Sequence, residues 1–307
     1  MISRDYDDEG YPTARAFDPS DTSILRRRVK EDGDDLLVVA QLRVANDAPF
    51  NTAKLCVLRH GGRGGGEWEL KEAVPIVHHH GGGAHDLKTW QDTDVVVPVG
   101  DRFLCWVNFD CSTLLLWDTT QQQGRTKLRY VPLPVKPVPP PLEDDEDGSY
   151  YQQQKPGNYY RCIAEGGPYG VRFVSIDNRC CCGAHVIRCS CEHSSSAFMV
   201  TMWSLALMTG DDEPMAWVKE CVLDCEELWS LVAGIGLPRV DLTCPVLSPE
   251  NPDAVCFVAC EGKSLWSVQI DVRKKTLLSA IPCPAHPHAC VNYCNNLSAK
   301  LHCPIAG

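Results

Sequence analysis

One stretch of the sequence, residues 94–134, constrains the fold of this chain more than any other. Its apolar runs are short and separated by polar turns, two of them carry a tryptophan, and the stretch ends in prolines. Short runs of β-branched and aromatic residues between turn residues are typical of antiparallel strands. We therefore predict strands at 94–97, 102–108, 113–118 and 127–131, a set with the size of one β-propeller blade.

Similar patterns continue along most of the chain. Further strands are predicted at 36–44, 53–59, 67–71, 170–176, 197–207, 216–223, 254–259, 264–271 and 275–281. Only residues 225–232 indicate a helix, with Glu226 and Glu227 in the first turn, where the helix dipole favours acids. The prediction is an all-β fold, a propeller-like array of short antiparallel strands, with a β-sandwich as the alternative.

Three segments look alike and predict an internal repeat. Each runs from a tryptophan-bearing strand through a polar turn into a second strand that carries Lys127, Lys219 or Lys275. Repeated units of this kind bury similar faces against their neighbours. We therefore expect the three segments to occupy equivalent places in the fold.

Composition divides the chain into segments. Residues 132–160 change to prolines, an acidic run and tyrosines, and bury too little apolar area to offset the entropy of ordering, so we predict a linker. It interrupts a β domain predicted over residues 21–281. Residues 1–20 are expected to be a flexible N-terminus, and the Cys- and His-rich residues 282–307 a poorly ordered tail.

Charge and hydropathy narrow the expected partners. The net charge is −11 and the pI about 5.3, which opposes binding along a phosphate backbone. No apolar run reaches the roughly 18 residues that a membrane-spanning helix needs. The N-terminus is acidic and lacks the apolar segment of a secretory signal. We expect protein partners, no nucleic acid, no membrane, and a location in cytoplasm or nucleus.

The chain has 18 cysteines, which we expect to stay reduced because no export signal is present. The densest group lies in residues 180–193, from Cys180 to His193, and thiolate and imidazole are zinc ligands. However, no two cysteines of the chain are separated by two residues, and adjacent extended residues point to opposite faces. We predict no metal site and no cofactor, with a zinc- or redox-responsive role of Cys180 to His193 as the alternative.

No other motif indicates catalysis. The histidines His78, His79, His80 and His85 flank a glycine loop and are expected at the surface. The sequence contains no Gly-x-Ser-x-Gly elbow, no phosphate-binding loop, no His-Glu-x-x-His and no dinucleotide fingerprint. We predict no catalytic and no cofactor-binding residue, and leave an unrecognised hydrolase as a further alternative.

Several runs together resemble one family. They are GEWELKEAVPIVHH, TDVVVPVGDRFLCWVNF, LRYVPLPV, VRFVSIDNRCCCG, AFMVTMWSLAL, WVKECVLDCEELW and GLPRVDLTCPVLSPENPDAVCFV. They are similar to the plant "domain of unknown function 1618" family, expanded in grasses, over residues 21–281. This resemblance implies a plant protein of uncharacterised activity, with no catalytic residues to transfer.

A second resemblance is more distant. The units ending in YVPLP and WVKE look like blades of F-box-associated propeller domains, which recognise substrates of ubiquitin ligases. No F-box helices are visible at this N-terminus, so a ligase role does not follow. Many strands, many loops and no catalytic motif predict a non-catalytic protein-interaction scaffold.

Overall fold

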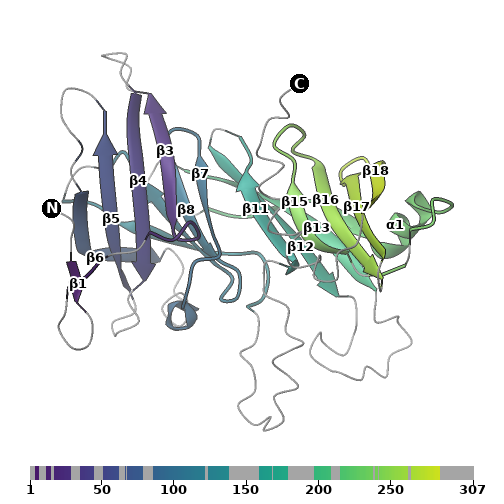
Figure 1. Ribbon diagram of the computed structural model, residues 1–307, viewed down its shortest axis with the longest axis horizontal. Helices are drawn as coiled ribbons and strands as arrows, with labels where there is room; N and C mark the ends of the chain where they lie inside the picture. Colours follow the sequence, from purple (N-terminus) through teal and green to yellow (C-terminus); the bar gives the residue numbers. More distant parts are fainter. Residues whose placement is uncertain are drawn as a thin grey trace, which may run out of the picture. The chain divides into compact units, whose positions relative to one another are not determined.

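The computed structural model of the chain describes residues 4–6, 12–14, 17–28, 35–44, 51–61, 66, 68–78, 86–121, 124–137, 159–167, 169–178, 197–208, 215–237, 239–240, 242–261 and 264–283. In this part of the chain nearly every element is a β-strand, with one α-helix, α1 (Cys225–Leu231), and a 3-10 turn at Asp86–Thr89 (Figure 1). The all-β prediction is confirmed. The chain divides into unit 1 (residues 1–140, 167–170 and 206–216) and unit 2 (residues 141–166, 171–205 and 217–307).

Unit 1 contains an eight-stranded sheet. Its strands, in spatial order, are β3 (Thr22–Arg28), β4 (Asp35–Val44), β5 (Thr52–His60), β6 (Trp68–His78), β10 (Leu128–Pro132), β9 (Thr113–Asp118), β8 (Phe103–Asn108) and β7 (Val95–Val99). Neighbouring strands are antiparallel except for β6 and β10, which are parallel. A separate two-stranded sheet pairs β1 (Arg4–Tyr6) with β2 (Pro12–Ala14).

The two ends of the eight-stranded sheet meet, and a hydrogen bond to Asp21 stabilises this closure. β3 lies against β7 and β8. The carbonyl oxygen of Asp21 accepts a hydrogen bond from Trp106 Nε1 on β8 at 2.8 Å, and its carboxylate accepts one from Gln41 Nε2 on β4 at 3.0 Å. Inside the curled sheet lies one hydrophobic core, in which Trp106 and Trp117 are fully buried. The closure therefore combines core packing with hydrogen bonds to a single residue.

The four strands predicted within residues 94–134 are all present, but they do not form a separate blade. β7, β8, β9 and β10 are consecutive antiparallel strands. β10 then pairs in parallel with β6, where Leu128 lies opposite Ile76 and Tyr130 lies opposite His78. Because this ladder satisfies the free edge of β10, the predicted four-stranded blade is one half of a larger, nearly closed sheet.

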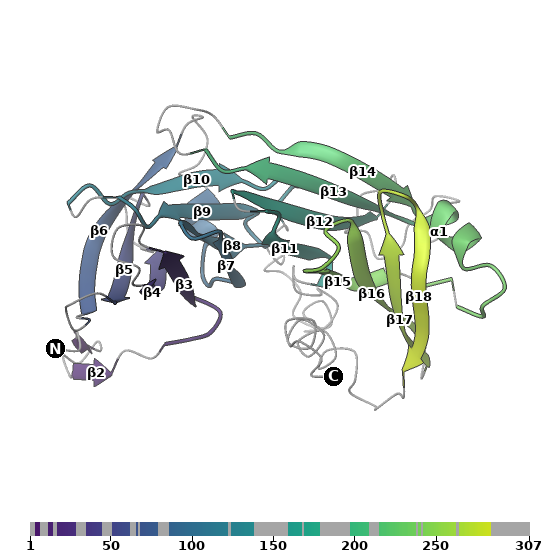
Figure 2. The ribbon, with the colours of Figure 1, turned by 90° about the horizontal axis from the view of Figure 1, so that it is seen from above.

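Unit 2 contains two four-stranded sheets. One is made of β11 (Arg161–Glu165), β12 (Gly170–Asn178), β13 (Phe198–Ala206) and β14 (Val218–Asp224), and the other of β15 (Leu242–Leu247), β16 (Ala254–Glu261), β17 (Ser264–Asp271) and β18 (Thr276–Cys283) (Figure 2). Both sheets contribute to one hydrophobic core, where Phe198 and Val200 from β13 and Phe257 from β16 are fully buried. Two sheets over a shared core form a β-sandwich, the alternative that the sequence left open.

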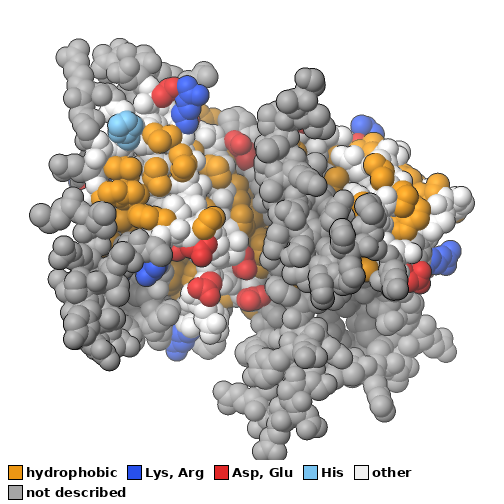
Figure 3. Space-filling model, viewed as in Figure 1, with side chains coloured by type: hydrophobic (Ala, Val, Ile, Leu, Met, Phe, Trp, Pro, Cys, Tyr) orange, Lys and Arg blue, Asp and Glu red, His pale blue; other side chains and the backbone are white. Residues whose placement is uncertain are grey.

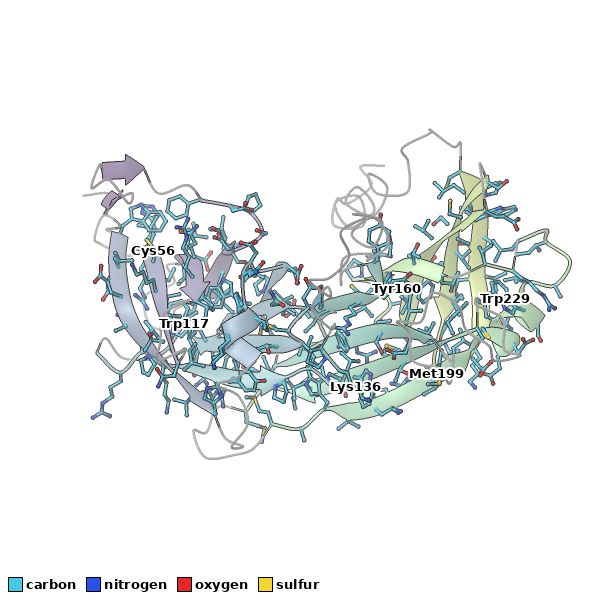
Figure 4. All side chains as sticks on the ribbon, turned by 90° about the horizontal axis from the view of Figure 1, so that it is seen from below. Cys56, Trp117, Lys136, Tyr160, Met199 and Trp229 are labelled. Carbon is cyan, nitrogen blue, oxygen red and sulfur yellow. The ribbon has the colours of Figure 1, made fainter. Side chains whose placement is uncertain are left out.

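The predicted helix is present as α1 and covers part of the unit 2 core. Its N-cap Asp224 accepts a hydrogen bond from the Glu226 amide at 2.9 Å, while the Glu227 carboxylate accepts one from the Asp224 amide at 3.1 Å. This reciprocal capping box satisfies amides that the first helical turn leaves without partners. Trp229, which Figure 4 labels, lies on α1. Its ring meets the Phe198 ring edge-on, with 5.9 Å between the centroids.

The three look-alike segments form equivalent strand pairs with different environments. β9 with β10, β13 with β14 and β17 with β18 are each antiparallel neighbours. Trp117 on β9 is fully buried, whereas Trp203 on β13 is half-buried with the Lys219 ammonium 4.9 Å from its ring centroid. The similarity therefore extends to hairpin formation, while burial depends on the sheet into which each hairpin is built.

The predicted segment boundaries stay predictions. β10 ends at Pro132, where the linker was predicted to begin, but residues 138–158 lie outside the described residues. β1 and β2 both lie within residues 1–20. β18 continues to Cys283, two residues past the predicted end of the domain, and residues 284–307 lie outside the described part of the chain.

Candidate interaction surface

An apolar row crosses the outer face of the eight-stranded sheet. Ile24 on β3 lies opposite Val39 on β4, which lies opposite Leu58 on β5, which lies opposite Trp68 on β6. Residues opposite each other share a face, and adjacent strands are about 4.8 Å apart, so these four span about 14 Å. The Phe17 ring stacks on Trp68 with centroids 4.8 Å apart and extends them. These five residues are the apolar row.

The apolar row faces away from the core because side chains alternate along each strand. Val38 and Val57, which neighbour members of the row in sequence, point inward and are at most 1% exposed. In contrast, Ile24 is 58% exposed and Phe17 43%, and the other three members are half-buried. Figure 3 shows hydrophobic side chains gathered on this face. A contiguous apolar strip in contact with water is typical of a protein-binding surface.

Polar side chains border the apolar row on the side of residue 26. There Arg26 lies opposite Leu37, which lies opposite the exposed His60. Arg26 Nε donates to an Asp35 carboxylate oxygen at 2.7 Å, yet the Arg26 side chain stays 70% exposed. An exposed pair of this kind contributes about 0–1 kcal/mol, so an incoming carboxylate can compete for Arg26.

The opposite border is also polar. Gln41 and Cys56 share the outer face but are buried, and the Gln41 amide is held by Asp21. Beyond them Arg43 and Lys54 lie opposite each other, and both are exposed. An apolar centre with a charged rim on two sides is the arrangement found in protein–protein interfaces.

Unit 2 carries a second polar cluster, in which the charges pair with one another. Arg172 Nη1 donates to the Pro252 carbonyl at 2.7 Å and to Asp253 Oδ1 at 2.8 Å. Arg273 Nε lies 3.2 Å from the same Asp253 oxygen, and Arg273 Nη2 donates to Glu220 Oε2 at 2.8 Å. Because Arg172 and Glu220 belong to one sheet and the other two residues flank strands of the second sheet, the network ties the sandwich together.

The same network keeps both of its carboxylates ionised. The hydrogen bond from the Ser204 hydroxyl, followed by that from Arg273, lowers the pKa of Glu220. Partial burial raises the pKa of Asp253, but the hydrogen bonds from Arg172 and Arg273 outweigh it and leave the pKa below its ordinary value. A catalytic acid or base needs a pKa near the working pH, so lowered carboxylate pKa values favour a structural role for this cluster.

Most residues considered for chemistry in the sequence lie outside the described residues. These are Cys180 to His193 (residues 180–193), His79, His80, His85 and residues 284–307. His78 is described and is the last residue of β6, where its ring lies 4.7 Å from that of Tyr130. In the part of the chain that the structure describes, no group of His, Cys, Asp or Glu side chains could hold a metal ion. The zinc or redox alternative stays a prediction.

Several of the described cysteines are buried thiols with little reactivity. Burial raises the pKa of the Cys105 thiol on β8, and it raises the pKa of Cys162 to about 11. A thiol with a raised pKa is a poor nucleophile, as expected of a small core residue. Cys244 on β15 differs because it is disulfide-bonded, against the expectation of reduced thiols. Separately, no helix among the described residues is long and apolar enough to span a membrane.

Sequence reasoning missed the apolar row. β3 was not predicted as a strand, because only two apolar residues, Ile24 and Leu25, precede three consecutive arginines and form too short an apolar run. The available signal was the short run of strand-forming residues Thr22, Ile24 and Leu25. The other members of the row lie on different strands, so only the register brings them together.

Comparison with known proteins supports the family resemblance. Residues 106–256, from within β8 to within β16, match the family model described as "Protein of unknown function (DUF1618)". A comparison with curated proteins finds no match. The matched residues include Trp106 of the unit 1 core and the Arg172–Asp253 pair of unit 2, whereas the apolar row precedes them. Through residues 106–256 the chain belongs to the DUF1618 family.

Proposed function

We propose that this chain is a non-catalytic protein-binding module whose protein partner docks on the apolar row. The observation that carries this proposal is Ile24, a large apolar side chain that is 58% exposed on a sheet face. Full burial of a side chain of this size contributes about 1.5–3 kcal/mol. The partner is then a protein and neither a nucleic acid nor a membrane, and the expected compartment remains cytoplasm or nucleus.

The position of the apolar row on strands supports a docking role. Cross-strand hydrogen bonds fix the backbone beneath every member from Ile24 to Trp68, so little conformational entropy is lost when a partner binds. A stable interface buries about 800 Å² on each partner, and a strip about 14 Å long forms the centre of such a surface. Aromatic residues are enriched at interface centres, and the row ends in the stacked Phe17 and Trp68.

A photo-reactive amino acid placed at residue 24 tests the proposal directly. Residue 218 is the matched control, because Val218 is 57% exposed on β14 of unit 2. Both proteins are exposed to extract of the source tissue and irradiated, and their adducts are identified by mass spectrometry. We expect a reproducible protein adduct at residue 24 and none at residue 218. Adducts at residue 24 no more frequent than at residue 218 would refute docking on the apolar row.

A pair of substitutions then measures the contribution of the row. Ile24→Glu should lower the affinity for the protein crosslinked at residue 24 by about tenfold or more, since about 1.4 kcal/mol corresponds to a factor of ten. Val218→Glu introduces the same charge at an equally exposed site and should leave the affinity unchanged. Hydrogen exchange over β4 and β5 for Ile24→Glu, and over β13 and β14 for Val218→Glu, checks that each variant is folded. Equal affinities of the two variants would contradict the proposal.

A further inference from the structure

Charges of both signs surround the apolar row. On the outer face of the sheet, the cations Arg26 and Arg43 and the carboxylate of Asp35 are exposed. The Asp21 carboxylate lies on the same face, where it accepts a hydrogen bond from the Gln41 amide at 3.0 Å. Because the charges are mixed, the face is not complementary to a partner that carries one sign alone. A mixed face complements a copy of itself when a two-fold axis brings opposite charges together.

On β4 the opposite charges lie at equal distances from the apolar row. Asp35 is four residues before Val39 and Arg43 is four residues after it, which is about 13 Å along the strand on either side. All three share the outer face, because side chains two residues apart in a strand point the same way. A two-fold axis that runs along the row, across the strands, reverses the direction of β4 in the second copy. Asp35 of each copy then faces Arg43 of the other.

The same axis pairs opposite charges on β3. Arg26 lies two residues after Ile24 and Thr22 lies two residues before it, so each Arg26 faces Thr22 of the second copy. The Asp21 carboxylate is beside that threonine and accepts a hydrogen bond from its hydroxyl at 2.7 Å. The Arg26 side chain is 70% exposed and its existing ion pair with Asp35 is weak, so its guanidinium can also reach this second carboxylate. Each dimer therefore brings opposite charges together at four places, twice on β3 and twice on β4.

Along this axis the apolar row meets itself. Ile24, Val39 and Leu58 of one copy face the same residues of the other, at the separation of about 10 Å that is usual for sheets packed face to face. The face extends about 27 Å along β4 and about 14 Å across the strands, a projected area of about 400 Å². Projecting side chains such as Phe17 and Ile24 add to this area, toward the about 800 Å² that each subunit buries in a stable dimer.

A two-fold axis along the strands fits the charges less well. Such an axis exchanges β4 with β5, and Arg43 and Lys54 lie opposite each other on these two strands. Each Arg43 would then face Lys54 of the second copy, and like charges held together oppose binding. The charges therefore favour the axis along the row over the axis along the strands.

We propose that the protein bound by the apolar row is a second copy of this chain, packed face to face about a two-fold axis that runs along the row. This inference rests on the proposed function, because it names the partner of the same surface. Strands of the two sheets run antiparallel across the interface, as in an aligned packing of two sheets. Apolar contacts on the axis provide affinity, and the charge pairs on both sides of it fix the orientation.

Reversing the two charges on β4 tests this axis. Asp35→Arg and Arg43→Asp each make like charges face each other in a dimer of identical chains, so each variant alone should dimerise about tenfold more weakly than the original chain. In an equal mixture, a dimer with one chain of each kind places the two substituted residues opposite each other and the two native residues opposite each other. Opposite charges then face each other at both places, so the mixture should regain dimers. Sedimentation of the full chain at low salt measures each equilibrium.

Two further variants serve as controls for the charge reversals. Lys219→Asp reverses the charge of an exposed lysine on β14 of unit 2 and should leave dimerisation unchanged. Ile24→Glu should weaken the dimer about tenfold or more, because it places a charge on the axis. Hydrogen exchange over β4 and β5 checks that unit 1 is folded in the Asp35 and Arg43 variants. A mixture no more dimeric than its two components would overturn the inference.

A photo-reactive amino acid at residue 24 of the purified chain locates the second copy. Isotope-labelled and unlabelled chains are mixed before irradiation, so that an adduct containing both kinds of chain was formed between copies. We expect adducts on β3 around Ile24 of the second copy. Adducts on β6 around Trp68 would indicate the axis along the strands and would contradict the proposed arrangement.

The outcomes separate the inference from the proposed function. A chain that stays monomeric up to its solubility limit, while residue 24 forms adducts with another protein, would overturn the second copy and keep the docking surface. A monomeric chain whose adducts at residue 24 are no more frequent than at residue 218 would refute both. A dimer that Ile24→Glu leaves intact would show that copies associate elsewhere, and it would also overturn the inference.

Discussion

Replacing Arg172 by Met should weaken unit 2 substantially without opening its core. The Arg172 side chain is 18% exposed and donates to both the Pro252 carbonyl and the Asp253 carboxylate. Methionine keeps an apolar stem but removes both hydrogen bonds. A hydrogen bond to a neutral acceptor contributes about 1 kcal/mol and one between charged groups about 1.5–3 kcal/mol. Because Arg273 still pairs with Asp253, we expect a loss of about 2–3 kcal/mol.

The measurement must report on unit 2 alone, because a chain of two compact units need not unfold in one step. Hydrogen exchange of peptides from β12 and β16, followed through a urea series, gives the free energy of unfolding for that unit. The matched control is Arg26→Met, the same substitution at an ion pair whose arginine side chain is 70% exposed. It should change the stability of unit 1 by about 0.5 kcal/mol or less.

Two results would refute the reasoning about Arg172. A loss below about 0.5 kcal/mol in Arg172→Met would mean that the desolvation of the buried pair cancels its attraction. Equal losses of stability in the two variants would mean that the partly buried Arg172 pair stabilises its unit no more than the exposed Arg26 pair does. Either result would remove the network as a stabilising link between the two sheets.

Three further predictions follow from specific contacts. Because the pKa values of Asp253 and Glu220 are lowered in the folded protein, their stabilisation is complete above their ordinary values of 3.8 and 4.5 and is lost as the pH falls. Urea midpoints of unit 2 should therefore decrease between about pH 5 and 3. Asp224→Ala removes the N-cap of α1 and should cost about 1 kcal/mol, seen as faster amide exchange in the helix. Trp106→Phe loses the 2.8 Å hydrogen bond to Asp21 and some core volume, so unit 1 should lose about 1–3 kcal/mol and exchange faster at β3 and β8.

Local sequence patterns predicted strands whose partners lie nearby in the chain. β9 (Thr113–Asp118) and β17 (Ser264–Asp271) begin and end where alternation and turn residues placed them. β6 was predicted to end at residue 71 but continues to His78, because its second half pairs in parallel with the distant β10. β15 was missed because Pro245 lies within it. The pairing of β15 with β16 shifts in register between Thr243 and Val246, so the ladder needs no hydrogen bond from an amide at residue 245.

The candidate surface depends on contacts that no local pattern contains. The hydrogen bond between Trp106 and Asp21 joins residues 85 positions apart and fixes β3 at the end of the curled sheet. Ile24, Val39 and Leu58 are aligned by the register of the consecutive antiparallel strands β3, β4 and β5, and a shift of one residue in that register would turn Ile24 inward.

The strand edges of both units explain why a partner should dock on a face. In unit 1 the ends of the eight-stranded sheet meet, so β3 and β7 cover each other's edges. In unit 2, β14 and β18 end their sheets, and each carries an extra residue opposite its neighbour, Glu220 in β14 and Leu278 in β18. Such bulges disrupt the ladder, and Pro282 in β18 cannot donate a hydrogen bond to an added strand. Glu220 also accepts hydrogen bonds from Ser204 and Arg273. The bulged residue that disrupts pairing at this edge is therefore also part of the network that links the two sheets.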